Sequence, residues 1–217
     1  MNKTIQILAA VGLLALPSAA AGQSFGIAGR VGTMGAGVEA AVQLSDRIAA
    51  RAGVGFMGLD FDATVEDIDV TFSLPDTWYN LGLDLYLTGA LRIGAGFLFK
   101  PDDFLMSAAF DTDQEIGGQL FTPEEIGTLT GAVSVGERAP YLLLGFGKHT
   151  SSGIGLSLDI GAAFLEEAQV SLQSDGTAAP GIIGPELDRE AQEMEDSIPT
   201  YVKIWPILSL GIRIGVG

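Results

Sequence analysis

Cysteine is absent from this chain of 217 residues, histidine occurs once, and lysine and arginine together number 11 against 27 aspartates and glutamates. The absence of cysteine excludes disulfide frameworks, thiolate metal sites and cysteine nucleophiles. A net charge of −16 argues against nucleic acid as a partner, because the phosphate backbone needs a basic surface. We therefore expect neither a nucleic-acid function nor a bound cofactor.

Long apolar runs are also missing after residue 21. No stretch of 18 residues there is free of charge or of strand-like alternation, so membrane-spanning helices are not expected. The mean hydropathy is nevertheless positive, at +0.37. A positive hydropathy without spanning helices favours transmembrane strands.

The first residues have the pattern of a secretion signal. Lys3 provides the positive charge, an apolar run extends from Ile5 to Leu16, and Pro17 ends it. Ala19 and Ala21 place small residues where a signal peptidase reads them. The alternative, a membrane anchor, is less favoured because the run is shorter than the roughly 20 residues of a spanning helix. We predict a signal peptide over residues 1–21.

Segments of about ten residues alternate between apolar side chains and polar or small ones, which is the period of a β-strand. From Trp78 to Thr88, for example, the odd positions are apolar, whereas the even positions include Gly82 and Asp84. Eight such segments are predicted as strands: 25–32, 35–44, 48–59, 78–88, 91–100, 140–148, 154–164 and 202–215.

Alternation alone also fits a soluble sandwich or a lipocalin-like barrel whose apolar face points inward. Here the polar face consists of glycine, serine and single charges, which suit a narrow lumen, whereas bulky aliphatic side chains meet no size limit when they face lipid. We therefore predict an all-β fold, an eight-stranded antiparallel up-and-down transmembrane β-barrel over residues 22–217. Residues 126–135 also read as extended, either as the upper part of the sixth strand or as a hairpin that would give ten strands.

Short and long connections alternate along the chain, apart from a short first connection near Thr33. The short turns are 45–47, 88–90 and 148–153, and the long loops are 60–76, 101–138 and 165–199. A barrel with both termini in the periplasm has short turns inside and long loops outside. The long loops hold 23 of the 27 carboxylates, so we expect a strongly acidic outer face.

Aromatic residues fall near the strand ends assigned to the outer surface, which indicates an aromatic belt at that interface. They are Phe56, Trp78, Tyr79, Phe97, Phe99, Tyr141, Phe164, Tyr201 and Trp205.

Charged residues at inward positions are the main candidate site. The alternation directs four cations and three anions into the lumen: Arg30, Arg51, Arg92 and Arg213, with Glu39, Asp84 and Asp159. They should pair, because an unpaired charge in a narrow, partly dehydrated barrel is costly. The network is either a structural closure of the bore or a gate that admits small solutes.

Two features of the long loops are further candidates. Residues 185–198 predict a short helix that begins near Pro185 and packs on the rim or on a neighbouring loop, or else covers the mouth as a lid. Asp111, Asp113 and Glu115 alternate in a way that could hold a hard cation such as Ca²⁺. The spacing and the glycine of an EF-hand are missing, so a solvated acidic loop is the preferred interpretation, with diffuse divalent cations around it.

The chain resembles the small outer-membrane barrels of the OmpA-transmembrane, OmpX and OmpW type in strand count, loop alternation and signal. It is also similar to an uncharacterised set of bacterial outer-membrane barrel proteins. The motifs that carry this likeness are Gly127-Thr128-Leu129-Thr130-Gly131, Ser157-Leu158-Asp159-Ile160-Gly161 with Phe164, Val170-Ser171-Leu172, and Trp205-Pro206 before Ser209-Leu210-Gly211. The resemblance implies an outer-membrane location, contact with outer-membrane lipid and insertion by the outer-membrane assembly machinery.

Enzymatic chemistry is not expected. Barrel enzymes of the outer membrane generally use a histidine beside serine, aspartate or glutamate. The only histidine here, His149, lies in a short turn assigned to the periplasm, with no carboxylate near it in the chain. Two functions remain: a narrow passive channel for small cationic or polar solutes, or a closed barrel whose acidic loops bind ions or partners.

Overall fold

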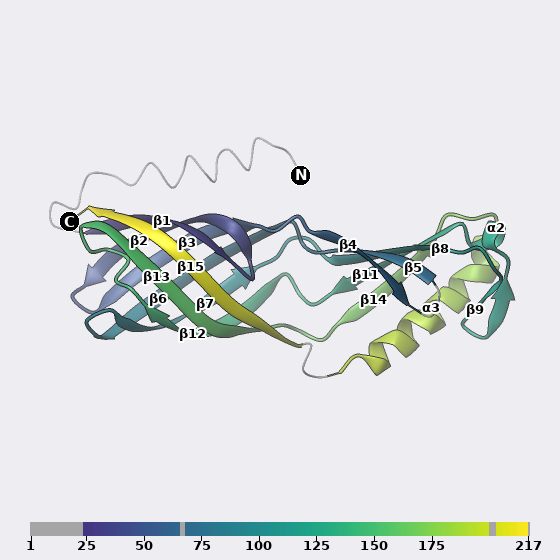
Figure 1. Ribbon diagram of the computed structural model, residues 1–217. Coiled ribbons are helices and arrows are strands. Elements are labelled where there is room, and N and C mark those ends of the chain that lie inside the picture. Colours follow the sequence, from purple (N-terminus) through teal and green to yellow (C-terminus); the bar gives the residue numbers. More distant parts are fainter. Residues whose placement is uncertain (1–23, 66–67, 200–202, 217) are drawn as a thin grey trace.

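The computed structural model describes residues 24–65, 68–199 and 203–216. Eight antiparallel strands close into a barrel in the order β1-β15-β13-β12-β7-β6-β3-β2 (Figure 1). They are β1 (Phe25–Gly32), β2 (Gly35–Ser45), β3 (Ile48–Phe56), β6 (Thr77–Thr88), β7 (Leu91–Phe99), β12 (Arg138–Phe146), β13 (Gly153–Phe164) and β15 (Ile204–Val216). The prediction of an eight-stranded antiparallel barrel is confirmed, whereas the predicted signal peptide lies outside the described residues.

Burial alternates residue by residue along the barrel strands, most regularly in β12 and β15. The outward positions carry large apolar side chains: Leu81 is 56% exposed and Ile212 is 60% exposed. An apolar surface that continues around the whole barrel cannot face water and is the surface that a transmembrane barrel presents to lipid. No helix among the described residues is long and apolar enough to span a membrane.

The two ends of the barrel differ. Phe25 and Val216, the outermost residues of β1 and β15, pair at one end, which also carries the short turns after β2, β6 and β12. We call this the proximal end. The opposite, distal end continues into a second layer of structure that the ribbon shows beyond the barrel (Figure 1).

The three segments predicted as long loops are folded, which corrects the sequence-based interpretation. They contain β4 (Asp60–Val65), β5 (Ile68–Ser73), β8 (Phe104–Ala109), β11 (Thr128–Ser134) and β14 (Gln169–Ser174), which form one sheet in the order β14-β11-β8-β5-β4. Each strand follows or precedes a barrel strand, and the order repeats that of β13, β12, β7, β6 and β3. Five of the eight barrel strands therefore continue, after short breaks, into a sheet above the distal rim.

This arrangement decides between eight and ten barrel strands. Residues 126–135 contain β11, which pairs with β8 and β14 in the distal sheet and enters β12 after a three-residue break. It forms no additional barrel hairpin, so the barrel keeps eight strands.

A long helix, α3 (Pro180–Ser197), packs against β14 at the edge of the distal sheet. The hairpin β9 (Gln114–Ile116) and β10 (Gln119–Phe121), together with α2 (Pro123–Ile126), completes this region. An apolar cluster joins these pieces: Ile116, Phe121, Ile126, Ile183 and Leu187. We refer to the distal sheet, this hairpin and both helices, residues 60–65, 68–73, 104–134 and 169–197, as the distal platform.

The helix differs from its prediction in length and start. It begins five residues earlier, with Pro180 in the first turn, where the missing N–H costs nothing, and Pro185 lies inside it. Leu187 and Ala191, which are four residues apart and so lie on one face of the helix, are buried. At α2, the Thr122 backbone N–H and hydroxyl both donate to Glu125, which lowers the pKa of that carboxyl.

The aromatic belt is smaller than predicted. Phe56, Phe97 and Phe164 do lie on the outside of the barrel, between 47% and 58% exposed. Trp78 and Tyr141 instead point into the barrel and are buried. Trp78 stacks on Trp205, with their ring centroids 5.1 Å apart. The two tryptophans therefore pack inside the barrel and are not part of an outer belt. Tyr201 lies outside the described residues.

Candidate functional site

Six of the seven charged residues predicted to face the lumen form one connected cluster in the proximal half of the barrel. Arg51 stands at its centre, with its guanidinium 3.6 Å from Glu39, 3.5 Å from Asp84 and 3.1 Å from Asp159. Arg30 is 3.7 Å from the same Glu39 carboxylate. Each of these side chains is at least nine-tenths buried.

Arg92 connects the two aspartates a second time. Its Nε donates to Asp84 at 3.2 Å and its Nη2 donates to Asp159 at 2.5 Å. Arg92 and Asp84 have no exposed surface. Removing such ions from water costs several kcal/mol each. This cost is offset only where the ion pairs are close and well hydrogen-bonded, as they are between Arg92 and the two aspartates.

Neutral side chains complete the cluster. Asn80 accepts a hydrogen bond from Arg30 at 2.7 Å and donates to Glu39 at 3.0 Å. The hydroxyl of Tyr141 accepts from Arg51 at 3.2 Å. The alternation places Asn80 on the inward face, but nothing in the sequence says which charges an amide at that position will join.

His149 is the residue that sequence reasoning missed. The turn between β12 and β13 folds back into the proximal mouth, so that this histidine is only 3% exposed. Its ring contacts Arg92 and lies 3.7 Å from Glu39 and 3.8 Å from Asp84, while its backbone N–H donates to Tyr86. The signal is the length of this turn, since the sequence assigns it six residues (148–153) and assigns three to each of the other two proximal turns (45–47 and 88–90).

The same turn closes the proximal mouth. Thr150 is 1% exposed and donates to Gln43 at 2.8 Å. Arg213, the seventh predicted lumen charge, donates to the carbonyls of Ser151 and Gly153. Its guanidinium therefore holds the turn and, among the described residues, forms no ion pair with a carboxylate.

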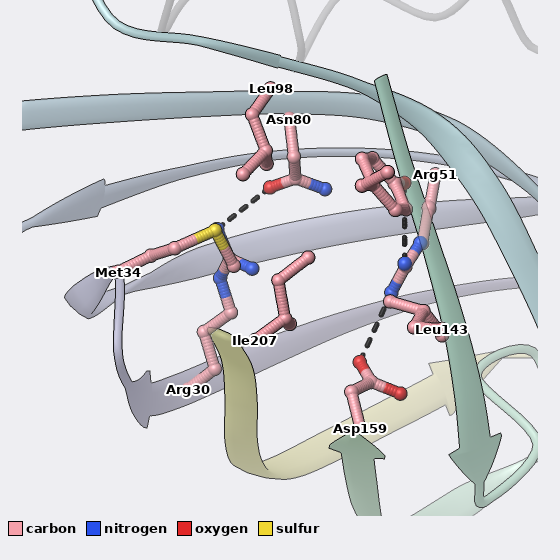
Figure 2. A pocket seen from close by; sticks show the side chains of 9 residues that line it. Arg30, Met34, Arg51, Asn80, Leu98, Leu143, Asp159 and Ile207 are labelled. Atoms are coloured by element: carbon pink, nitrogen blue, oxygen red, sulfur yellow. Dashed lines mark hydrogen bonds and ion pairs between the residues drawn. The ribbon is translucent and has the colours of Figure 1, made fainter. Parts of the chain in front are cut away.

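An apolar layer fills the lumen toward the distal end. Its buried members are Met34, Trp78, Leu98, Ala139, Tyr141, Leu143, Ala163 and Ile207. Trp205 and Phe104 pack on this layer, with the centroids of their rings 5.8 Å apart. Figure 2 shows the border between the two layers: Arg30 and Arg51 reach toward Asn80 and Asp159, and Leu98, Leu143 and Ile207 lie beside them.

Little free space remains at this border. The cavity there has room for about one water molecule. Among the described residues, Arg51 Nε, Asp84 Oδ1 and Arg92 Nη1 are buried without a hydrogen-bond partner, although the first two form an ion pair at 3.5 Å. The lumen is thus packed by charged side chains in its proximal half and by apolar side chains in its distal half.

The candidate cation loop has a different character. Asp111, Asp113 and Glu115 are exposed at the far end of the distal platform, and Glu115 belongs to β9. Within residues 24–65, 68–199 and 203–216, no group of three histidine, aspartate or glutamate side chains is placed to hold a metal ion.

Carboxylates also gather where the platform meets the barrel. A cavity of about 310 Å³ under the end of α3 is lined by Val135, Glu166, Glu167, Ala168, Glu195, Asp196, Ile198 and Lys203. Lys203 donates to Glu167 at 2.8 Å, and this hydrogen bond lowers the pKa of Glu167. Glu195 accepts from the backbone N–H of Val170, which ties α3 to β14.

Two solved structures from Acinetobacter baumannii have the same fold. The CarO2 structure aligns with a TM-score of 0.55 and 18% identity, covering 89% of this chain and 98% of that one. The CarO structure aligns with a TM-score of 0.50 and 18% identity, covering 87% and 96%. No family model and no curated protein matches the sequence. The likeness establishes the architecture, an eight-stranded transmembrane β-barrel, over most of both chains.

Proposed function

We propose that this protein is a non-enzymatic outer-membrane barrel with a closed lumen, which acts through its distal platform on the outside of the cell. The observation that carries the proposal is the filling of the lumen by two successive layers. A solute would have to displace the buried ion cluster around Arg51 and Arg92 and also the apolar layer around Trp78 and Leu98. Among the residues that the structure describes, the cavity at the border between the two layers has room for about one water molecule.

Three features support the location and the orientation. The outside of the barrel is apolar and rimmed by phenylalanines, as lipid contact requires. The proximal turns are short and the distal segments long, which matches turns in the periplasm and a platform outside. The platform carries most of the carboxylates, which suits a solvated surface that attracts divalent cations from solution and bridges through them to anionic lipid headgroups.

The position of His149 supports a function without catalysis. Its ring is enclosed between Arg92, Glu39 and Asp84, and the residue is only 3% exposed. An imidazole held among two carboxylates and a guanidinium serves closure of the lumen.

Conductance across a planar bilayer tests the closed lumen. We expect purified protein, shown to be folded by a heat-dependent gel shift, to insert without producing current steps. A porin added afterwards to the same bilayer must give steps, which controls for the membrane and the recording. Discrete steps from the folded protein alone would overturn the proposal.

A narrow channel is the second candidate, and one observation favours it. Arg51 Nε and Asp84 Oδ1 form an ion pair at 3.5 Å without a hydrogen bond, and among the described residues Arg92 Nη1 has no hydrogen-bond partner, so the cluster has donors and an acceptor with which its ion pairs can rearrange. If steps are seen, neutralising Asp84 or Arg92 should change their size, because a path through the lumen passes both side chains.

A further inference from the structure

The strand β4 forms a free edge of the distal sheet. The sheet order ends with β4, and in the part of the chain that the structure describes no strand pairs with its outer side. In the barrel below, the corresponding position beside β3 is occupied by β2. The hairpin between β1 and β2 ends at the rim, however, so β4 rises above it without a neighbour (Figure 1).

The register shows which backbone groups face this free edge. Leu74 N–H donates to Leu59 at 3.0 Å, which makes this a hydrogen-bonded pair of the β4–β5 ladder. Hydrogen-bonded pairs alternate along an antiparallel ladder, so Phe61 and Ala63 also direct their backbone groups to β5. The N–H and C=O groups of Asp60, Asp62 and Thr64 therefore point outward, ready to receive another strand.

The two faces of β4 differ in chemistry. On one face Phe61 is 50% exposed and stacks on Phe72, with their ring centroids 5.3 Å apart. On the other face Asp60 and Asp62 are exposed, and Thr71 donates to Asp62 at 2.7 Å. The chain has no lysine or arginine between Arg51 and Arg92, so no basic side chain of this segment neutralises the aspartates.

We propose that β4 binds an extended, basic segment of a partner by strand addition. The segment alternates lysine or arginine with apolar residues: the apolar side chains lie beside Phe61, the basic ones beside Asp60 and Asp62, and its backbone pairs with the three outward residues. This inference rests on the proposed function, because it names the chemistry of the partner that the platform receives.

A second copy of the chain fits this edge poorly. Antiparallel pairing of two β4 strands would bring the aspartates of both copies to one short ladder, and each copy carries a net charge of −16. Charge complementarity therefore selects a basic strand over self-association.

The test uses folded full-length protein in lipid nanodiscs and a fluorescent seven-residue peptide in which lysine and valine alternate. Anisotropy should report saturable binding. The double variant Asp60→Asn with Asp62→Asn should weaken it roughly 2- to 30-fold, the range given by two opposite-charge cross-strand pairs. Asp188→Asn with Glu193→Gln removes two exposed carboxylates from α3 instead, and binding should stay within about twofold.

Asp62→Pro separates strand addition from simple charge attraction. It removes an outward N–H that β5 does not use, so the sheet tolerates it, yet it should weaken binding by more than Asp62→Asn. Equal affinity of the two Asp62 variants, or equal binding of a peptide with the lysines and valines in separate blocks, would overturn the proposal. The proposal would also be overturned if the protein formed dimers that the Asp62→Pro substitution dissociates, because β4 would then pair with a second copy of the chain.

The two proposals fail separately. If the protein produces no current steps in the bilayer and does not bind the peptide, strand addition is rejected and the closed lumen is retained.

Discussion

Replacing Arg92 with methionine is expected to lower the free energy of unfolding by about 3–5 kcal/mol. The variant keeps a long side chain in the lumen but removes the charge that bridges Asp84 and Asp159. Arg51 is then the only arginine of the cluster that pairs with these two carboxylates, from which it lies 3.5 and 3.1 Å. A urea titration in lipid vesicles, followed by the gel shift and tryptophan fluorescence, measures the change.

Lys203→Met is the matched control. It removes an ion pair with Glu167 whose lysine and carboxylate side chains are 39% and 85% exposed, so the loss should stay below about 1 kcal/mol. Adding Asp84→Asn to Arg92→Met should recover part of the stability, because it removes one of the uncompensated charges. If Arg92→Met costs no more than Lys203→Met, the lumen cluster does not hold the barrel together.

Replacing Gly96 with alanine is expected to destabilise the barrel by about 3 kcal/mol or more, or to prevent its folding. Gly96 points inward from β7, and a Cβ there would lie 2.6 Å from Gly82 Cα and closer still to the Leu81 carbonyl oxygen. Both atoms are backbone of the neighbouring β6, which cannot move aside without breaking the ladder. The folded yield after refolding into detergent, read from the gel shift, measures the effect.

Gly29→Ala is the control for glycine removal itself. Gly29 also lies within a barrel strand, but it faces outward and a Cβ there meets no atom within 4 Å. This variant should change stability by no more than about 0.5 kcal/mol. Similar folded yields for the two variants would contradict the close approach of β6 and β7.

The barrel was predictable from the sequence because its signal is local. Each strand faces lipid on one side and a narrow lumen on the other, so apolar side chains alternate with glycine and single charges along ten residues. The same alternation assigns Arg51, Asp84 and Asp159 to the inward side of their strands, and in the structure Arg51 lies within ion-pair distance of both aspartates. The alternation does not reveal which charged side chains form ion pairs, because Arg51 and Asp159 are 108 residues apart in the sequence and come together only in the closed barrel.

The platform was not predictable in the same way. Its strands are three to seven residues long and carry many carboxylates, so their alternation is too short and too polar to stand out. The first turns of α3 contain Gly181, Gly184 and Pro185, which are typical of loops; burial of Ile183 and Leu187 against the platform stabilises them as helix. His149 lies in a turn, where the alternation of a strand does not apply and the direction of the side chain cannot be predicted from it.

Site-directed cysteine labelling in intact cells tests most directly whether the protein acts at the cell surface through its platform. The chain has no cysteine of its own, so single variants give an unambiguous signal. Gln192→Cys on the exposed side of α3 should react with a membrane-impermeant maleimide on whole cells, whereas Asp46→Cys in the turn between β2 and β3 should react only after the outer membrane is permeabilised. The reverse pattern, with Asp46→Cys labelled and Gln192→Cys protected, would place the platform in the periplasm and contradict the account.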